Sequence, residues 1–196
     1  MYTPTSFQVE DEHIIDDFLR ANAFGQLLST HNGRISGSYL PFLYDSEAKT
    51  LLGHLARVNP QATNGDSKDV LVTFEGAHGY ISPSWYTKPG VPTWDYQAVH
   101  VYGTVSYFSE PARLAEVVDA LSNEYERHEK NPWIPDYPVS MLDAIVGVEI
   151  QINEIQAKFK LSQNRSQKDI ESVCEALDER GGLALSRAIR EANNIR

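Results

Sequence analysis

The first candidate for ligand chemistry is the stretch Gly53 to Pro60, Gly-His-Leu-Ala-Arg-Val-Asn-Pro, which directly follows an apolar run. Arg57 offers a planar guanidinium that can bind two phosphate oxygens at once, and the backbone amides of a turn can add donors. An exposed arginine beside a histidine, His54, that bonds backbone groups would give the same sequence. No glycine-rich phosphate loop accompanies the stretch, so both interpretations stay open.

The second candidate is the connection from Tyr80 to Tyr96, which is rich in large aromatic side chains, hydroxyls and prolines. Ring faces together with hydroxyl donors suit a flat heteroaromatic ligand. A loop held to the core by its tryptophans would have the same composition. Lys158 and Lys160 share one face of the last strand by alternation. They could bind a phosphate as a cationic pair, or protect the edge of a sheet.

The usual catalytic and metal-binding motifs are absent from the sequence. It contains no His-Glu-x-x-His and no Gly-x-Ser-x-Gly, and no metal site is expected. Cys174 lies on the apolar stripe of an expected helix, which is more consistent with a core position than with a nucleophile. His54 and His100 could each ligate a haem iron in principle, although structural roles are commoner for such histidines.

These stretches require a framework built mainly of strands. Alternation and turn signals predict strands over residues 24–30, 34–44, 51–54, 70–74, 79–82, 96–108, 146–152 and 155–160, the last pairing back on the one before it. Asn32-Gly33 predicts a hairpin turn. Helical patterns cover residues 10–21, 110–125, 166–179 and 183–193. The sequence therefore predicts a mainly β (α+β) fold, a small barrel with an N-terminal helix, one inserted helix and C-terminal helices. We expect a single domain of residues 1–196 with a helical extension over residues 166–196.

Composition limits the partners of the protein. The net charge is -10, from 27 acidic and 17 basic residues, which disfavours a polyanion. The only locally positive segment carries Arg187, Arg190 and Arg196, and the helix before it is acidic, so direct DNA binding has little support. The sequence shows no secretory signal and no apolar run of membrane-spanning length. With a single cysteine, these features predict a cytoplasmic protein with no membrane partner.

Several longer segments recur in the order typical of a known family. They are residues 38–42, 53–60, 78–86, 91–96, 145–150 and 160–164, with His100 and Gly103 among them. Together they resemble the PaiB family of FMN-binding negative transcriptional regulators. The resemblance implies a split β-barrel related to pyridoxamine-phosphate oxidases and flavin reductases. It also implies a homodimer with FMN at the subunit interface.

The resemblance further implies which residues contact FMN. Arg57, with His54 and Asn59 nearby, falls where related barrels hold the phosphate, and residues 38–40 lie on the strand expected to line the isoalloxazine ring. The full set of implied cofactor contacts is Ser38, Tyr39, Leu40, His54, Leu55, Ala56, Arg57, Asn59, Ser82, Trp85, Thr93, Trp94, Lys160 and Gln163.

Three functions are consistent with this resemblance. The first is a transcriptional regulator that responds to flavin or to its redox state. The second is an FMN-dependent oxidoreductase of the pyridoxamine-phosphate-oxidase or flavin-reductase kind, and the third is a haem-binding split barrel. No residue stands out as a required acid or base. Because flavin chemistry can proceed without one, the sequence leaves enzymatic activity open.

Overall fold

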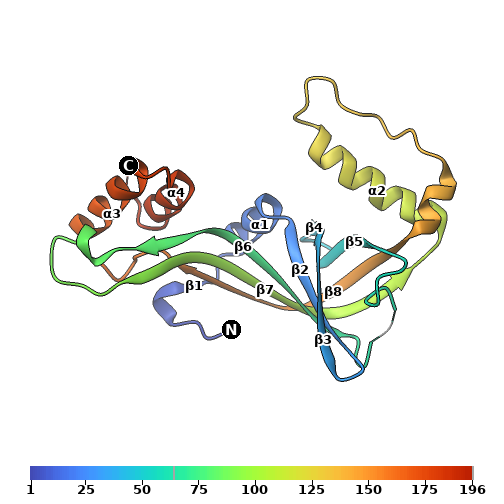
Figure 1. Ribbon diagram of the computed structural model, residues 1–196, viewed down its shortest axis with the longest axis horizontal. Coiled ribbons are helices and arrows are strands. Elements are labelled where there is room, and N and C mark those ends of the chain that lie inside the picture. The colour runs from blue at the N-terminus through green and yellow to red at the C-terminus, as the bar shows by residue number, and fades with distance from the viewer. Residues whose placement is uncertain (64, 196) are drawn as a thin grey trace. The chain divides into compact units, whose positions relative to one another are not determined.

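The computed structural model describes residues 1–63 and 65–195 (Figure 1). Arg196, one of the arginines of the predicted basic segment, lies outside the described residues. The helices within this part of the chain are η1 (Thr5–Phe7), α1 (Glu12–Ala21), η2 (Pro83–Trp85), α2 (Pro111–Glu126), η3 (Val139–Ala144), α3 (Gln167–Glu179) and α4 (Leu183–Ala192). The strands are β1 (Gln8–Val9), β2 (Phe24–His31), β3 (Arg34–Pro41), β4 (Leu43–Asp45), β5 (Thr50–Ala56), β6 (Asp69–Ile81), β7 (Thr93–Phe108) and β8 (Ile145–Lys160).

The described strands form one sheet in the order β3-β2-β6-β7-β8-β5-β4, and β1 also pairs with β8. β2 and β3 form the predicted antiparallel hairpin, in register from Phe24 opposite Pro41 to His31 opposite Arg34. Asn32 and Gly33 both have positive φ, as a two-residue hairpin turn requires. The predicted α+β fold is confirmed, with an N-terminal helix, one inserted helix and two C-terminal helices.

Three of the predicted strand boundaries were wrong. β8 is continuous from Ile145 to Lys160, whereas the sequence predicted two strands pairing with each other. No glycine or proline interrupts residues 150–158, so the backbone has no reason to turn there. β6 is likewise one strand where two were predicted. In contrast, residues 34–44 divide after Pro41, and the amide of Phe42 leaves the hairpin to donate to the carbonyl of Ala23.

The chain divides into two compact units by its internal contacts. Unit 1 comprises Met1–Ile15, Glu75–Val99 and Gln156–Arg196, and unit 2 comprises Asp16–Phe74 and His100–Ile155. The residue ranges of β6, β7 and β8 run through both units. The single-domain organisation with an extension over residues 166–196 stays a prediction.

Unit 2 carries α2, whose apolar stripe packs on the strands and on η3. Leu114, Val117 and Leu121 on α2 are buried together with Phe108 and Leu142. The helix begins at Pro111. A proline is tolerated in the first turn because the amide hydrogen that it lacks would have no partner within the helix. Ser109, which precedes the start of α2, and Ile145, which follows η3, both contact Arg57.

Unit 1 carries the helix pair α3 and α4. The Ser166 hydroxyl accepts from the amide of Asp169 at the start of α3, as the sequence predicted. Ile170, Val173, Cys174 and Leu177 form the buried stripe of α3. Gly79 on β6 leaves room for α4, because a Cβ at this position would lie 2.9 Å from the Cδ2 atom of Leu185.

Candidate functional site

A cavity of about 370 Å³ opens in unit 2 beside β3 and the turn that follows β5. Its size falls in the range of about 300–1,000 Å³ that is usual for small-molecule sites. The lining residues are Ser36, Gly37, Ser38, Ala56, Val58, Asn59, Pro60 and Gln61. The cavity therefore brings together Ser38, Ala56 and Asn59, which come from two of the predicted cofactor-binding segments.

The turn after β5 shapes one wall of the cavity. The amide of Asn59 donates to the carbonyl of Ala56 at 2.9 Å, and the carbonyl of Asn59 accepts from Ala62 at 2.8 Å. The side-chain oxygen of Asn59 also accepts from the amide of Gln61 at 2.9 Å. Asparagine side chains favour this local bonding, and the proline at position 60 restricts the backbone between them. The turn is thus held together by its own hydrogen bonds.

A chain of neutral polar groups links the two walls. Asn59 Nδ2 donates to Ser38 Oγ at 2.8 Å, and Ser38 Oγ donates to Gln61 Oε1 at 2.6 Å. Gln61 Nε2 then donates to Ser29 Oγ at 2.7 Å, deep in the barrel wall, where the Gln61 side chain is 1% exposed. Such a connected network holds its members in one arrangement. It offers hydroxyl and amide groups to a ligand but no formal charge.

Gln61 was missed by the sequence analysis. It follows Asn59-Pro60 directly, and its large amide in a loop gave no signal that it would be buried. The bonds to Ser29, Ser36 and Leu27 that account for its burial join residues about 25 to 34 positions away in the chain.

Arg57 is not part of the cavity lining. Its Nε donates to the carbonyl of Asp143 at 2.6 Å and its Nη2 to the carbonyl of Ile145 at 2.8 Å. Nη1 reaches Ser109 Oγ at 3.3 Å. These bonds tie the end of β5 to the start of β8 and to Ser109, the residue after β7. A guanidinium has five N–H groups, so those three bonds leave two others. The role of Arg57 as the phosphate ligand stays a prediction.

The remaining predicted residues of unit 2 lie apart from the cavity lining. Leu40 and Leu55 are buried in the core. Tyr39 is 65% exposed and stacks on Phe24 with ring centroids 5.9 Å apart. Because neighbouring strand residues point to opposite faces, Tyr39 and Ser38 face different sides of β3. His54 pairs with Gly147 of β8, and its buried Nδ1 has no hydrogen-bond partner among the described residues. Burial lowers the pKa of His54, which favours the neutral ring.

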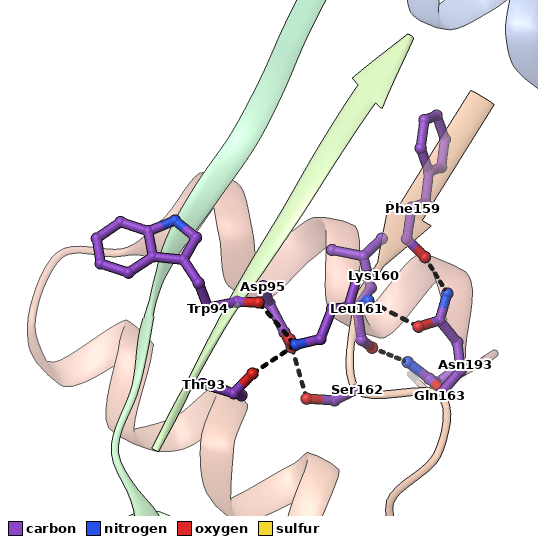
Figure 2. A network of polar contacts seen from close by, with 9 residues as sticks. All are labelled: Thr93, Trp94, Asp95, Phe159, Lys160, Leu161, Ser162, Gln163 and Asn193. Atoms are coloured by element: carbon purple, nitrogen blue, oxygen red, sulfur yellow. Dashed lines mark hydrogen bonds and ion pairs between the residues drawn. The ribbon is translucent and has the colours of Figure 1, made fainter. Parts of the chain in front are cut away.

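In unit 1, Lys160 joins the start of β7 to the end of β8 (Figure 2). Its Nζ donates to Thr93 Oγ1 and to the carbonyl of Trp94, both at 2.7 Å, and to Asp95 Oδ1 at 2.9 Å. The Asp95 carboxylate is buried and also accepts from Ser162 Oγ at 2.6 Å. The three N–H groups of the ammonium therefore all have protein acceptors, and its charge is balanced by Asp95.

Gln163 closes the turn between β8 and α3. Its Nε2 donates to the carbonyl of Phe159 at 2.6 Å, and its Oε1 accepts from the amide of Leu161 at 2.7 Å. Ser162 lies between them with a φ of 62°. Asn193 Nδ2, near the end of α4, donates to the carbonyl of Leu161 at 2.9 Å (Figure 2). Lys160 and Gln163 thus both bond the protein's own backbone.

An aromatic cluster lies on the same unit, and we define it as His78, Tyr80, Trp85 and Trp94. Trp94 is 50% exposed and stacks on His78 with ring centroids 6.0 Å apart. The centroid of the Tyr80 ring lies 6.4 Å from that of Trp94, with the rings tilted, and 6.5 Å from that of Trp85, with the rings edge to face. The hydroxyl of Ser82 accepts from the amide of Ser84 and caps η2, which carries Trp85. The cluster offers exposed ring surface of the kind that a flat ligand can stack on.

Comparison with known proteins identifies the family. The family model described as "Putative FMN-binding domain" matches residues 1–154. The Protease synthase and sporulation protein PAI 2 of Bacillus subtilis (strain 168) is 40% identical over 185 residues, which cover 90% of this chain and 89% of that protein. The chain belongs to the PaiB family of FMN-binding proteins. FMN is the cofactor of this PaiB-type protein.

Solved structures agree on the fold. The flavocytochrome Anf3 from Azotobacter vinelandii matches with a TM-score of 0.63 and 16% identity, over 84% of this chain and 75% of that one. The FAD and haem binding protein from Mycobacterium smegmatis matches with a TM-score of 0.63 and 14% identity, over 84% and 79%. The predicted split-barrel fold of this PaiB-type chain is therefore confirmed. Among the described residues, every helix is too short or too polar to cross a membrane.

Proposed function

We propose that the cavity beside β3 binds the polar edge of FMN. The observation that carries this proposal is the coincidence of the cavity with Ser38, Ala56 and Asn59, three residues implied as cofactor contacts by the family resemblance. The flavin ring has carbonyl and N–H groups along one edge, and the ribityl chain carries hydroxyls. Ser38 and Asn59, held in place by the buried Gln61, can exchange hydrogen bonds with such groups without a charge to neutralise.

Arg57 is proposed as the cation for the phosphate of FMN. The phosphate is close to a dianion and requires a positive charge with several donors. The bonds of Arg57 to Asp143 and Ile145 fix the guanidinium in place, so little side-chain entropy remains to be lost on binding. The charge of Lys160, in contrast, is already balanced by Asp95.

The aromatic cluster is proposed as a contact of the flavin ring, through Trp85 and Trp94. Ser82 supports Trp85 by capping η2, and Thr93 supports Trp94 by bonding Lys160. Separate variants test the cluster and the cavity. In this proposal Lys160 and Gln163 position the cluster rather than donate to FMN.

We further propose that the protein works as a cytoplasmic homodimer in gene regulation. The family resemblance supports the dimer, and the name of the Bacillus relative links that protein to protease synthesis and sporulation. The flavin, or a protein partner, would transmit the signal. Direct DNA contact has less support, because Arg190 is paired with Asp178 at 2.9 Å. Fluorescence anisotropy titrations with random-sequence DNA and with the upstream region of the gene, at about 0.15 M salt, test whether the protein binds DNA directly. Sub-micromolar binding that Arg190→Glu weakens would contradict the expectation that it does not.

Spectra and titration test the cofactor site. The purified protein should show flavin bands near roughly 370 and 450 nm rather than a haem band near about 400 nm. Ser38→Ala and Asn59→Ala should each weaken binding of both FMN and riboflavin, because the two ligands share the ring and the ribityl chain. Asn123→Ala, at an exposed position on α2, is the matched control. Unchanged affinity in both cavity variants would place the flavin elsewhere.

A further inference from the structure

The segment from Ser82 to Thr87 carries Trp85 but has no buried anchor of its own. η2 spans only three residues, and none of them is buried. A helix this short has little stability without outside contacts. The position of Trp85 must therefore be set by whatever the segment packs against.

α3 and its flanking residues supply these contacts. The Arg165 guanidinium lies 4.2 Å from the centre of the Tyr86 ring, and the Arg180 guanidinium lies 5.2 Å from that of Trp85. These arginines stand at opposite ends of α3. Cations over aromatic faces are attracted to the ring, most strongly for tryptophan. Arginines at both ends of α3 thus contact the segment.

Asp169 adds hydrogen bonds to this contact. Its Oδ1 accepts from the amide of Thr87 at 2.7 Å and from the Thr87 hydroxyl at 2.6 Å. Its Oδ2 accepts from Ser166 Oγ at 2.8 Å. The side chain is 7% exposed, so water competes little for these bonds. Asp169 also lies in the first turn of α3, where a negative charge is favoured.

α3 is itself held firmly. Val173 and Cys174 are fully buried, and the amide of Gly182 closes the helix by donating to the carbonyl of Leu177 at 2.8 Å. A rigid helix can fix a loop, whereas the loop, with no buried residue, cannot fix the helix.

We propose that Arg165, Asp169 and Arg180 form a clamp that positions Trp85 for stacking against the flavin ring. The inference rests on the proposed function of the aromatic cluster as a ring contact. It makes the residues after 154, beyond the part that the family model matches, necessary for full flavin affinity. Each of the three is a positioning residue, because Arg180 acts through Trp85, Arg165 through Tyr86 and Asp169 through Thr87.

Hydrogen exchange and flavin titration test the clamp together. Asp169→Ala should speed exchange of the Thr87 amide by about tenfold or more, because this amide loses its acceptor. The same variant should weaken binding about three- to tenfold, and the loss should be similar for FMN and riboflavin because both ligands contain the ring. Thr87→Val removes only the hydroxyl at an exposed loop position and should show a smaller change in the same direction. It serves as the readout if Asp169→Ala does not fold.

Controls separate the clamp from general stability. Arg180→Ala should weaken flavin binding, and Arg180→Lys should restore part of it because the cation is kept. Glu175→Ala, at an exposed site on α3, should change neither measurement. Unchanged Thr87 exchange in Asp169→Ala would overturn the clamp, and faster exchange with unchanged flavin affinity would overturn its positioning role. Absence of flavin binding by the parent protein would overturn the proposed function and the flavin role of the clamp, whereas the exchange data would still judge the clamp itself.

Discussion

At the scale of a single residue, the proposed contact of Arg57 with the phosphate can be tested separately from the contacts of the flavin ring. Arg57→Ala should weaken FMN binding by about 1.5–3 kcal/mol, the range for hydrogen bonds to a charged group. Riboflavin lacks the phosphate, so its affinity should stay the same. Isothermal titration with both ligands measures the difference. Arg57→Lys keeps the charge but loses the planar guanidinium, so its FMN affinity should lie between those of the parent and Arg57→Ala. Equal losses for FMN and riboflavin would mean that Arg57 acts only by tying β5 to β8.

Asp169 gives the protein a defined response to acid. Hydrogen bonds from Thr87 and Ser166 lower the pKa of Asp169 to about 2, from an ordinary value of 3.8. A carboxyl group with a lowered pKa stabilises the fold above its ordinary pKa, and this stabilisation is lost as the pH falls through the folded value. The difference in free energy of unfolding between parent and Asp169→Asn should therefore be constant above pH ~5 and shrink between about 4 and 2. Urea denaturation across this range measures it, and a difference that grows on acidification would contradict the assignment.

At the scale of elements, the sequence predicted the helices better than the ends of the strands. The buried stripe of α3 and the Asn32-Gly33 turn depend on neighbours within a few positions, so local patterns revealed them. The unbroken β8 depends on pairing with β5 at one end and β1 at the other. Likewise Ser38 was predicted as a site residue, while Gln61 was missed because its partners are distant in the chain. Local spacing carries no information about such pairing.

A substitution at Gly147 tests how closely β8 packs against Phe108. A Cβ at this position would lie 2.2 Å from ring atoms of Phe108, which is buried against α2. Gly147→Ala should destabilise the fold by about 1–3 kcal/mol, because the Phe108 ring must leave its favoured position. The midpoint of urea denaturation reports this loss. Gly33→Ala is a useful comparison, since no atom of a described residue lies within 4 Å of the added Cβ and the φ of 71° is what opposes the change. Equal stability of Gly147→Ala and the parent would show that the ring adapts without cost.

At the scale of the whole molecule, the proposed homodimer predicts a particle of twice the mass of the 22.0 kDa chain. Exposed Phe24, Tyr39 and Trp94 are the kind of large aromatic surface that an interface covers. Light scattering at micromolar concentration should therefore give about 44 kDa with FMN bound, independent of dilution over about a tenfold range. A mass of one chain with flavin still bound would rule out the dimer.

The burial of Cys174 has a practical consequence for measuring that dimer. Its side chain is fully buried, and burial raises the pKa of the thiol, so little reactive thiolate forms at neutral pH. It is also the chain's only cysteine. A single cysteine introduced at an exposed position, such as Glu175, would therefore accept a nitroxide spin label without removal of the native residue. Pulsed electron paramagnetic resonance would then report one distance between the two copies, with and without flavin.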